Sequence, residues 1–275
     1  MTQIPDIRLN DGSSIPQLGF GVFQIPAEET ARAVTEALRL GYRHIDTAAI
    51  YGNEREVGEA IAAAGIPREQ LYITTKLWNS EQGSDKAIAA FEASVEKLGT
   101  APDLYLIHWP TPARDLYVDS WKALEKLKAD GRVRSIGVSN FQPAHLRRLL
   151  AETEVVPAVN QIELHPYLQQ RELRAVHAEH GIVTEAWSPL AQGELLDDPA
   201  LQQIAEAHGK TTAQVVLRWH VQIGNVVFPK SVTPSRIADN AAIFDFELSD
   251  AELAAIEALD RDHRTGFHPD EMEIA

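Results

Sequence analysis

Short apolar runs alternate with longer amphipathic segments along most of the chain. In the amphipathic segments the apolar residues recur every three or four positions, which is the period of an α-helix. The first of these segments places Val34 and Leu38 on one face and ends before Gly41, a residue that readily forms the left-handed turn after a helix. Near the other end of the chain, Ser249 and Glu252 have the spacing of a capping box. The pattern therefore predicts a series of helices with defined starts and ends.

The apolar runs between these helices have the length of β-strands. Eight of them are predicted, over residues 18–22, 43–46, 71–76, 104–108, 133–138, 159–163, 182–187 and 226–229. A strand followed by a helix and another strand favours parallel pairing. Eight such units in about 250 residues are typical of a closed barrel. We therefore predict an α/β fold, a single (β/α)8 TIM barrel, as one domain over residues 1–275.

The two ends of the chain lie outside this repeat. Residues 1–16 contain two short apolar segments around the turn Asn10-Asp11-Gly12, which predicts a β-hairpin that plugs the bottom of the barrel. Residues 260–275 form a C-terminal tail that could close over a pocket or fray.

A doubly wound parallel sheet is the alternative fold. When such a sheet binds a dinucleotide, it usually carries G-x-G-x-x-G in its first strand–helix turn. Here Gly19 and Gly21 are followed by Gln24 where the third glycine would fall. The barrel is therefore the favoured interpretation.

Composition narrows the possible functions. The chain has 275 residues, with 25 Lys and Arg against 40 Asp and Glu, so its formal net charge is −15, and it contains no Cys. The negative charge argues against nucleic acid or an anionic membrane as a partner. Without Cys there is no disulfide, thiolate catalysis or Cys-ligated zinc. No apolar run approaches a membrane span and no secretory signal is visible, so we expect a cytoplasmic protein.

Ionisable side chains stand at the ends of three consecutive predicted strands. Asp46 ends the second strand, Lys76 the third and His108 the fourth, while Tyr51 follows Asp46 in a loop. Each residue alone has a structural explanation. Asp46 would be a helix cap, Tyr51 an aromatic residue at the rim, Lys76 a solvated strand end and His108 a core histidine. Because strand ends meet at one rim of a barrel, where catalytic groups gather, the combination favours an active site.

The same residues lie in segments that resemble the aldo-keto reductase family. The segments are GYRHIDTA (41–48), YGNE (51–54), TKLW (75–78), LIHWP (106–110), IGVSNF (136–141), NQIELHP (160–166) and VFPKS (227–231). The resemblance runs in family order from about Ile7 to Leu259. AAIYGN (48–53), HWPTP (108–112) and HPDE (268–271) add a narrower likeness to the bacterial 2,5-diketo-D-gluconate reductases.

The resemblance implies an NADPH-dependent reductase of aldehydes and ketones, with diketo sugar acids such as 2,5-diketo-D-gluconate among the candidate substrates. Asp46, Tyr51, Lys76 and His108 would be its catalytic tetrad. Tyr51 would donate the proton, because a phenol is protonated at neutral pH. Lys76, held by Asp46, would lower the pKa of Tyr51. His108 would bind the carbonyl oxygen together with Tyr51.

The resemblance also implies a site for NADPH or NADP+. Ser139, Asn140 and Gln161 would bind the nicotinamide carboxamide, and Trp187 would stack on the nicotinamide ring. The loop over the pyrophosphate would consist of Ser188, Pro189, Leu190, Gln192 and Gly193. The clamp on the adenosine phosphate would consist of Lys230, Ser231, Val232, Arg236, Asp239 and Asn240. The structural alternative is strand-end hydrogen bonding for Ser139, Asn140 and Gln161, a core position for Trp187, and a solvated basic face for Lys230 and Arg236.

Two features of the clamp bear on the cofactor. Lys230 and Arg236 are a local pair of cations on an acidic chain, and arginine can chelate a 2′-phosphate, which favours NADPH over NADH. Asp239 departs from the family, which usually carries Glu before Asn240. Its shorter carboxylate would weaken the contact with adenine.

The substrate walls would be Phe23, Ile50, Trp78 and Trp109, together with His108. A metal site is not expected, because His177 and His180 share a helix face but lack a third ligand. The family resemblance implies a monomer whose partner is a small carbonyl compound. Two other functions stay open: a binding subunit that senses cofactor redox state with little turnover, and a cofactor-independent barrel hydrolase or lyase.

Overall fold

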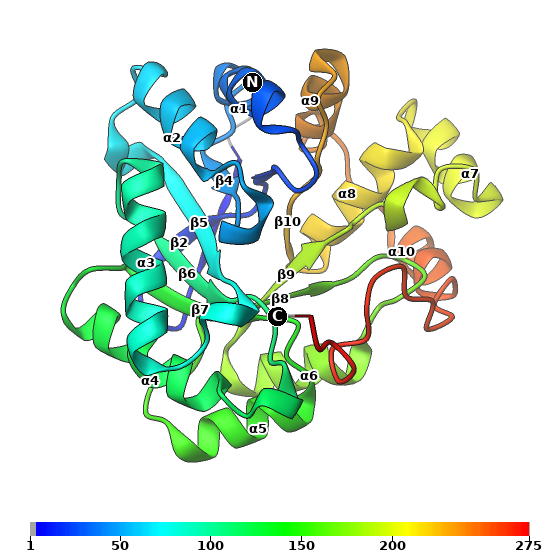
Figure 1. The fold of residues 1–275 in the computed structure, drawn as a ribbon. Coiled ribbons are helices and arrows are strands. Elements are labelled where there is room, and N and C mark those ends of the chain that lie inside the picture. The colour runs from blue at the N-terminus through cyan, green and yellow to red at the C-terminus, as the bar shows by residue number, and fades with distance from the viewer. Residues whose placement is uncertain (1–3, 275) are drawn as a thin grey trace.

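The centre of the molecule is a closed barrel of parallel strands (Figure 1). The computed structural model describes residues 4–274. In chain order around the barrel the strands are β3 (Phe20–Gly21), β4 (His44–Asp46), β5 (Tyr72–Leu77), β6 (Leu104–Ile107), β7 (Ser135–Ser139), β8 (Val159–Glu163), β9 (Val183–Trp187) and β10 (Val226–Val227). The barrel closes where the Gly19 N–H donates to Val227 O at 2.9 Å and the Val227 N–H donates to Gln17 O at 3.0 Å. The predicted (β/α)8 barrel and all eight of its strands are confirmed.

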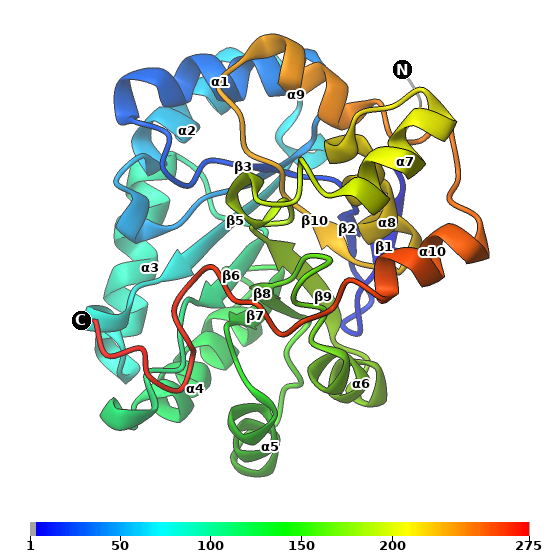
Figure 2. The same cartoon turned by 90° about the vertical axis from the view of Figure 1, so that its right-hand side faces the viewer.

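Helices surround the barrel (Figure 2). Within residues 4–274 they are α1 (Ala27–Arg39), α2 (Glu54–Ala63), α3 (Ser84–Leu98), α4 (Tyr117–Ala129), α5 (Pro143–Glu152), α6 (Arg171–His180), α7 (Pro199–His208), α8 (Thr212–Gln222), α9 (Pro234–Ala241) and α10 (Asp250–Glu257). The predicted capping box is present at the start of α10, where the Ser249 side chain accepts from the Glu252 N–H. Over the described part of the chain, no helix is long and apolar enough to cross a membrane.

The predicted N-terminal hairpin covers one end of the barrel. β1 (Asp6–Arg8) pairs antiparallel with β2 (Ser14–Pro16), with Ile7 opposite Ile15. Ile15 is fully buried and belongs to an apolar cluster with strand residues that include Leu104 and Val226. Residues 1–3 of the predicted hairpin segment and residue 275 of the predicted tail lie outside the described residues.

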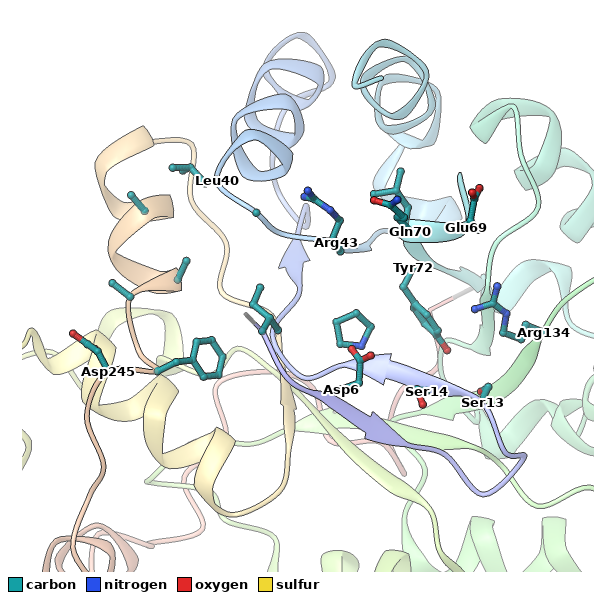
Figure 3. Close-up of a pocket in the computed structure, with 18 residues that line it drawn as sticks. Asp6, Ser13, Ser14, Leu40, Arg43, Glu69, Gln70, Tyr72, Arg134 and Asp245 are labelled. Atoms are coloured by element: carbon teal, nitrogen blue, oxygen red, sulfur yellow. The ribbon is translucent and has the colours of Figure 1, made fainter. Parts of the chain in front are cut away.

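A cavity of about 1250 Å³ lies on the hairpin side of the molecule. Figure 3 shows Asp6, Ser14, Arg43 and Tyr72 among the side chains that line it. None of the predicted site residues lines this cavity. The C-terminal ends of the parallel strands lie at the opposite rim of the barrel, where the catalytic residues of such barrels gather. The candidate active site is therefore expected at that rim.

Candidate active site

A buried ion pair lies at the base of the site. Lys76 in β5 neighbours Asp46 at the end of β4, and Lys76 Nζ donates to Asp46 Oδ1 at 2.7 Å and to Thr47 O at 2.8 Å. The Lys76 side chain is 0% exposed. Burial alone would lower the pKa of Lys76, but the charge and hydrogen bond of Asp46, together with Tyr51 and Glu185, outweigh burial and the pKa is raised. Lys76 is therefore an ammonium ion, with Asp46 as its counter-charge.

The other two tetrad residues meet above this pair. Tyr51 ends a short 3-10 turn, η1 (Ala49–Tyr51), that follows β4, and His108 follows β6 directly. Lys76 Nζ lies 5.1 Å from the centroid of the Tyr51 ring, and the rings of Tyr51 and His108 are 5.7 Å apart, edge to face. The structure thus brings together the four residues that the strand ends predicted.

Burial controls the protonation of Tyr51 and His108. It raises the pKa of Tyr51, and the charge of Lys76, which lowers that pKa as expected, offsets only part of the effect. The net lowering of the Tyr51 pKa that we expected from Lys76 is therefore not present in this structure. Burial, with help from the charge of Lys76, also holds the pKa of His108 well below its usual range. At neutral pH the site presents a protonated phenol and a neutral imidazole.

A hydrogen-bonded network extends beneath the tetrad and includes Glu185, which was not predicted as a site residue. Gln161 Nε2 donates to Asp46 Oδ2 and to Glu185 Oε2, both at 2.9 Å. These two bonds use both amide hydrogens, and Gln161 Oε1 forms no hydrogen bond with another described residue. Glu185 is fully buried in β9, where burial, followed by the charge of Asp46, raises its pKa to about 8. The sequence feature that could have revealed Glu185 is that it is the one charged residue of its strand.

Glu185 should make the stability of the fold fall as the pH rises. Its pKa is about 8 in the fold against an ordinary value of 4.5, so the folded state holds a proton that the unfolded chain releases. Between these values the free energy of unfolding should drop by up to about 1.4 kcal/mol per pH unit from this group. Glu185→Gln, whose amide oxygen can still accept from Gln161, should remove that slope. Urea unfolding at pH 6 and pH 8 measures it, with the exposed Glu179→Gln as control; an unchanged slope in Glu185→Gln would contradict the buried proton.

The residues predicted to bind the nicotinamide end lie side by side at the rim. Ser139 Oγ donates to Gln161 O at 2.8 Å, and Asn140 Nδ2 donates to His108 O at 2.9 Å. Trp187 Nε1 donates to Asn140 Oδ1 at 2.8 Å, which fixes one end of the half-buried indole. Asn140 adopts a φ of 65°, in the left-handed region that asparagine tolerates better than most residues. Asn140 therefore connects the catalytic and the predicted cofactor groups.

The other predicted cofactor residues occupy two segments beyond β9 and β10. The segment 188–193 contains the turn η5 (Ala191–Gly193), and Ser188, Gln192 and Gly193 in it have positive φ. The segment 230–240 contains exposed Lys230 and Arg236, neither of which forms an ion pair with a described acidic residue. The remaining predicted members of these two segments are Pro189, Leu190, Ser231, Val232, Asp239 and Asn240. The second segment thus combines free cations with the start of α9, where an anion is favoured.

Aromatic rings form the outer part of the site. Phe23 contacts Tyr51 at 5.0 Å between ring centroids, and Trp78 contacts His108 at 5.2 Å. Trp109 continues the series, because its ring centroid lies 6.4 Å from that of His108. Phe23 is 55% exposed and Ile50 is 48% exposed. The predicted substrate walls therefore lie around the tetrad, with apolar surface open to a ligand.

His177 of α6 has a structural role. His177 is buried; its Nδ1 lies 2.8 Å from Thr184 Oγ1 and its Nε2 lies 2.9 Å from Asn160 Nδ2. Across residues 4–274, no group of three or more His, Asp or Glu side chains is placed to hold a metal ion.

Comparisons with known proteins identify the family of the chain. The model of the Aldo/keto reductase family matches residues 17–261. An aldo-keto reductase of Mycobacterium sp. (strain KMS) is 60% identical over 96% of both chains, and the methylglyoxal reductase DkgA of Yersinia pestis is 52% identical over 98% of both. A crystal structure of a Gox0644 variant in complex with NADPH superposes with a TM-score of 0.96, at 49% identity over 100% of both chains. The chain therefore belongs to the aldo/keto reductase family.

Proposed function

We propose that this enzyme reduces small aldehydes and ketones with NADPH. The observation that carries the proposal is the protonated Tyr51 phenol, which lies beside neutral His108 and above the buried Lys76–Asp46 pair. The methylglyoxal reductase named above supports 2-oxoaldehydes as a substrate class. Diketo sugar acids such as 2,5-diketo-D-gluconate stay a prediction, as do the cytoplasmic location and the monomeric state.

The side chains of the site can manage the proton and the charge of this reaction. NADPH, when bound, supplies a hydride to the carbonyl carbon. Neutral His108 can donate a hydrogen bond to the carbonyl oxygen and polarise the bond. Tyr51 then gives its proton to the same oxygen, and the charge of Lys76 stabilises the tyrosinate that remains. Asp46 keeps Lys76 charged and in place throughout.

The groups along the rim fit a nicotinamide dinucleotide. The unused Gln161 Oε1 is an acceptor suited to the NH2 group of a carboxamide, because both amide hydrogens of Gln161 are donated to Asp46 and Glu185. Trp187 offers a half-buried ring for stacking. Ser139 and Asn140 would complete this end of the site. Lys230 and Arg236 would hold the phosphates of the adenosine end.

The test is consumption of NADPH by the purified protein. Its absorbance should fall in the presence of methylglyoxal, other aldehydes and ketones, or 2,5-diketo-D-gluconate, and the ranking of rates identifies the substrate class. Tight binding of NADPH without consumption in any mixture would instead favour a subunit that senses cofactor redox state. Turnover of a substrate without NADPH would favour a hydrolase or lyase.

The 2′-phosphate should be recognised by Arg236. Arg236→Ala should weaken the binding of NADPH by about tenfold, because a charge-assisted bond to phosphate is lost, and should change NADH binding less than twofold. Calorimetric dissociation constants for both cofactors measure this effect. Arg147→Ala, which removes an exposed arginine on α5, is the matched control. Equal losses for both cofactors in Arg236→Ala would rule out this role.

A further inference from the structure

A second buried carboxylate lies at the rim and has no part in the mechanism above. Glu163 ends β8 and is 0% exposed. Its Oε1 accepts from the Thr265 N–H at 2.6 Å, from Thr265 Oγ1 at 2.7 Å and from His165 Nε2 at 3.1 Å. Its Oε2 accepts from the Gly266 N–H at 3.1 Å and lies 3.5 Å from Arg264 Nη1. One side chain thus anchors three consecutive residues of the C-terminal tail.

These contacts keep Glu163 ionised. Burial would raise the pKa of its carboxyl, but hydrogen bonds from His165 and Thr265 outweigh burial and lower the pKa. Hydrogen bonds to a charged acceptor are stronger than those between neutral groups. The carboxylate is therefore a firm anchor for the tail.

The anchored tail runs across the mouth of the barrel. Figure 2 shows it as the red segment that leaves α10 and passes the ends of β8 and β9 on its way to the side of α3. The His263 N–H donates to Tyr167 O at 3.0 Å before the Glu163 contacts. Gln192 Nε2, from the loop predicted to cover the pyrophosphate, lies 3.4 Å from Thr265 O. The tail therefore contacts the predicted cofactor site.

At the anchored point the tail backbone contacts the ring of Trp187. A Cβ atom on Gly266 would lie 2.5 Å from Trp187 Cη2 and 3.2 Å from Trp187 Cζ3, so only glycine fits beside this ring. The opposite end of the indole is held by Asn140, which accepts from Trp187 Nε1. The ring is thus fixed at both ends, by a hydrogen bond at one and by the tail at the other.

We propose that Glu163 is a positioning residue for the nicotinamide end of the cofactor. By binding Thr265 and Gly266, it holds the tail backbone against Trp187 and fixes the indole in the orientation that stacks on nicotinamide. The inference rests on the proposed function, in which Trp187 receives the nicotinamide ring. It assigns to this buried carboxylate a role that acts through the tail and Trp187.

Two ligands distinguish this role from a general structural one. NADPH contains the nicotinamide ring, whereas adenosine 2′,5′-bisphosphate contains only the adenosine end with its 2′-phosphate. A variant that displaces Trp187 should weaken NADPH alone. A variant that loosens the whole rim should weaken both ligands.

The experiment measures calorimetric dissociation constants for both ligands in three variants. Glu163→Gln places an amide NH2 group against the tail donors, so at least one of the N–H groups of Thr265 and Gly266 loses its acceptor. Gly266→Ala leaves Glu163 intact but forces the ring or the tail to move. Each should weaken NADPH by about five- to tenfold, in the range of an aromatic stacking interaction, and leave adenosine 2′,5′-bisphosphate within twofold. Glu172→Gln, which makes the same change at an exposed glutamate of α6, is the matched control and should bind both ligands like wild type.

The proposal is overturned if Glu163→Gln binds NADPH like wild type, or if it weakens both ligands equally. Circular dichroism checks folding, and Thr265→Val, which removes a hydroxyl donor to Glu163, takes the place of Glu163→Gln if that variant does not fold. Gly266→Ala tests the contact with Trp187 separately, and unchanged NADPH affinity in this variant would overturn the role of the tail. Wild-type protein that fails to bind NADPH would overturn the proposed function itself. Wild-type protein that binds and oxidises NADPH, alongside variants with unchanged affinity, would overturn only the role of Glu163.

Discussion

Tyr51→Phe should lower the turnover number for carbonyl reduction by about 10²- to 10⁴-fold. The change removes a single hydroxyl, the proton donor in our mechanism, and leaves the aromatic ring between Phe23 and His108 in place. The dissociation constant for NADPH should therefore change less than twofold. Steady-state rates from NADPH absorbance and calorimetric affinities measure the two quantities separately.

A second buried tyrosine provides the control for this prediction. The hydroxyl of Tyr105 in β6 is also buried and has no hydrogen-bond partner among the described residues. Tyr105→Phe should therefore leave turnover unchanged. If Tyr51→Phe reduced carbonyls at the wild-type rate, the proton would have to come from another group.

Asp46→Ala should lower the free energy of unfolding by about 3–5 kcal/mol, because it leaves the ammonium of Lys76 buried without a counter-charge. The Lys76 side chain is 0% exposed, so water cannot replace the lost partner without rearrangement. Lys76 can escape this cost only by losing its proton. The stability of the variant should then rise with pH, since the unfolded chain binds the proton more tightly than the fold does.

Urea unfolding of the double variant Asp46→Ala/Lys76→Met tests this explanation. Removing both charges should recover a large part of the stability lost in the single variant, because no unpaired buried charge is left. Neither variant should reduce carbonyls at the wild-type rate, since the tetrad is incomplete in both. Equal stability of the single and double variants would show that the loss comes from packing and not from charge.

The periodicity of the chain predicts most elements correctly, but not all of them. The strand 159–163 has the predicted bounds, whereas β3 is only Phe20–Gly21, because the flanking predicted residues continue as loop and as the contact that closes the barrel. The predicted strand 226–229 is likewise shorter in the structure, where β10 is only Val226–Val227 and Phe228 continues as loop. In both cases contacts with neighbouring elements determine where the element ends, which the hydrophobic pattern of the segment alone does not define.

The tetrad could be predicted because its members stand out from their own strands. Asp46, Lys76 and His108 are ionisable residues at the ends of apolar runs, and the barrel topology places such ends together. Glu185 and Glu163 are also ionisable residues buried in strands. They were missed because nothing in their immediate sequence indicates that one is bound by Gln161 and the other by the C-terminal tail.

The sequence by itself determined the order of strands and helices, the kinds of chemical groups available and the rim at which they gather. These properties follow from spacing along the chain and from the rule that parallel strands end on one side. Only the tertiary structure decided the protonation states, because burial raises the pKa of Tyr51 more than the charge of Lys76 lowers it. It alone placed Gly266 against Trp187, a contact between residues far apart in the chain. Burial and contacts of this kind depend on how distant segments pack, which local patterns of hydrophobicity do not encode.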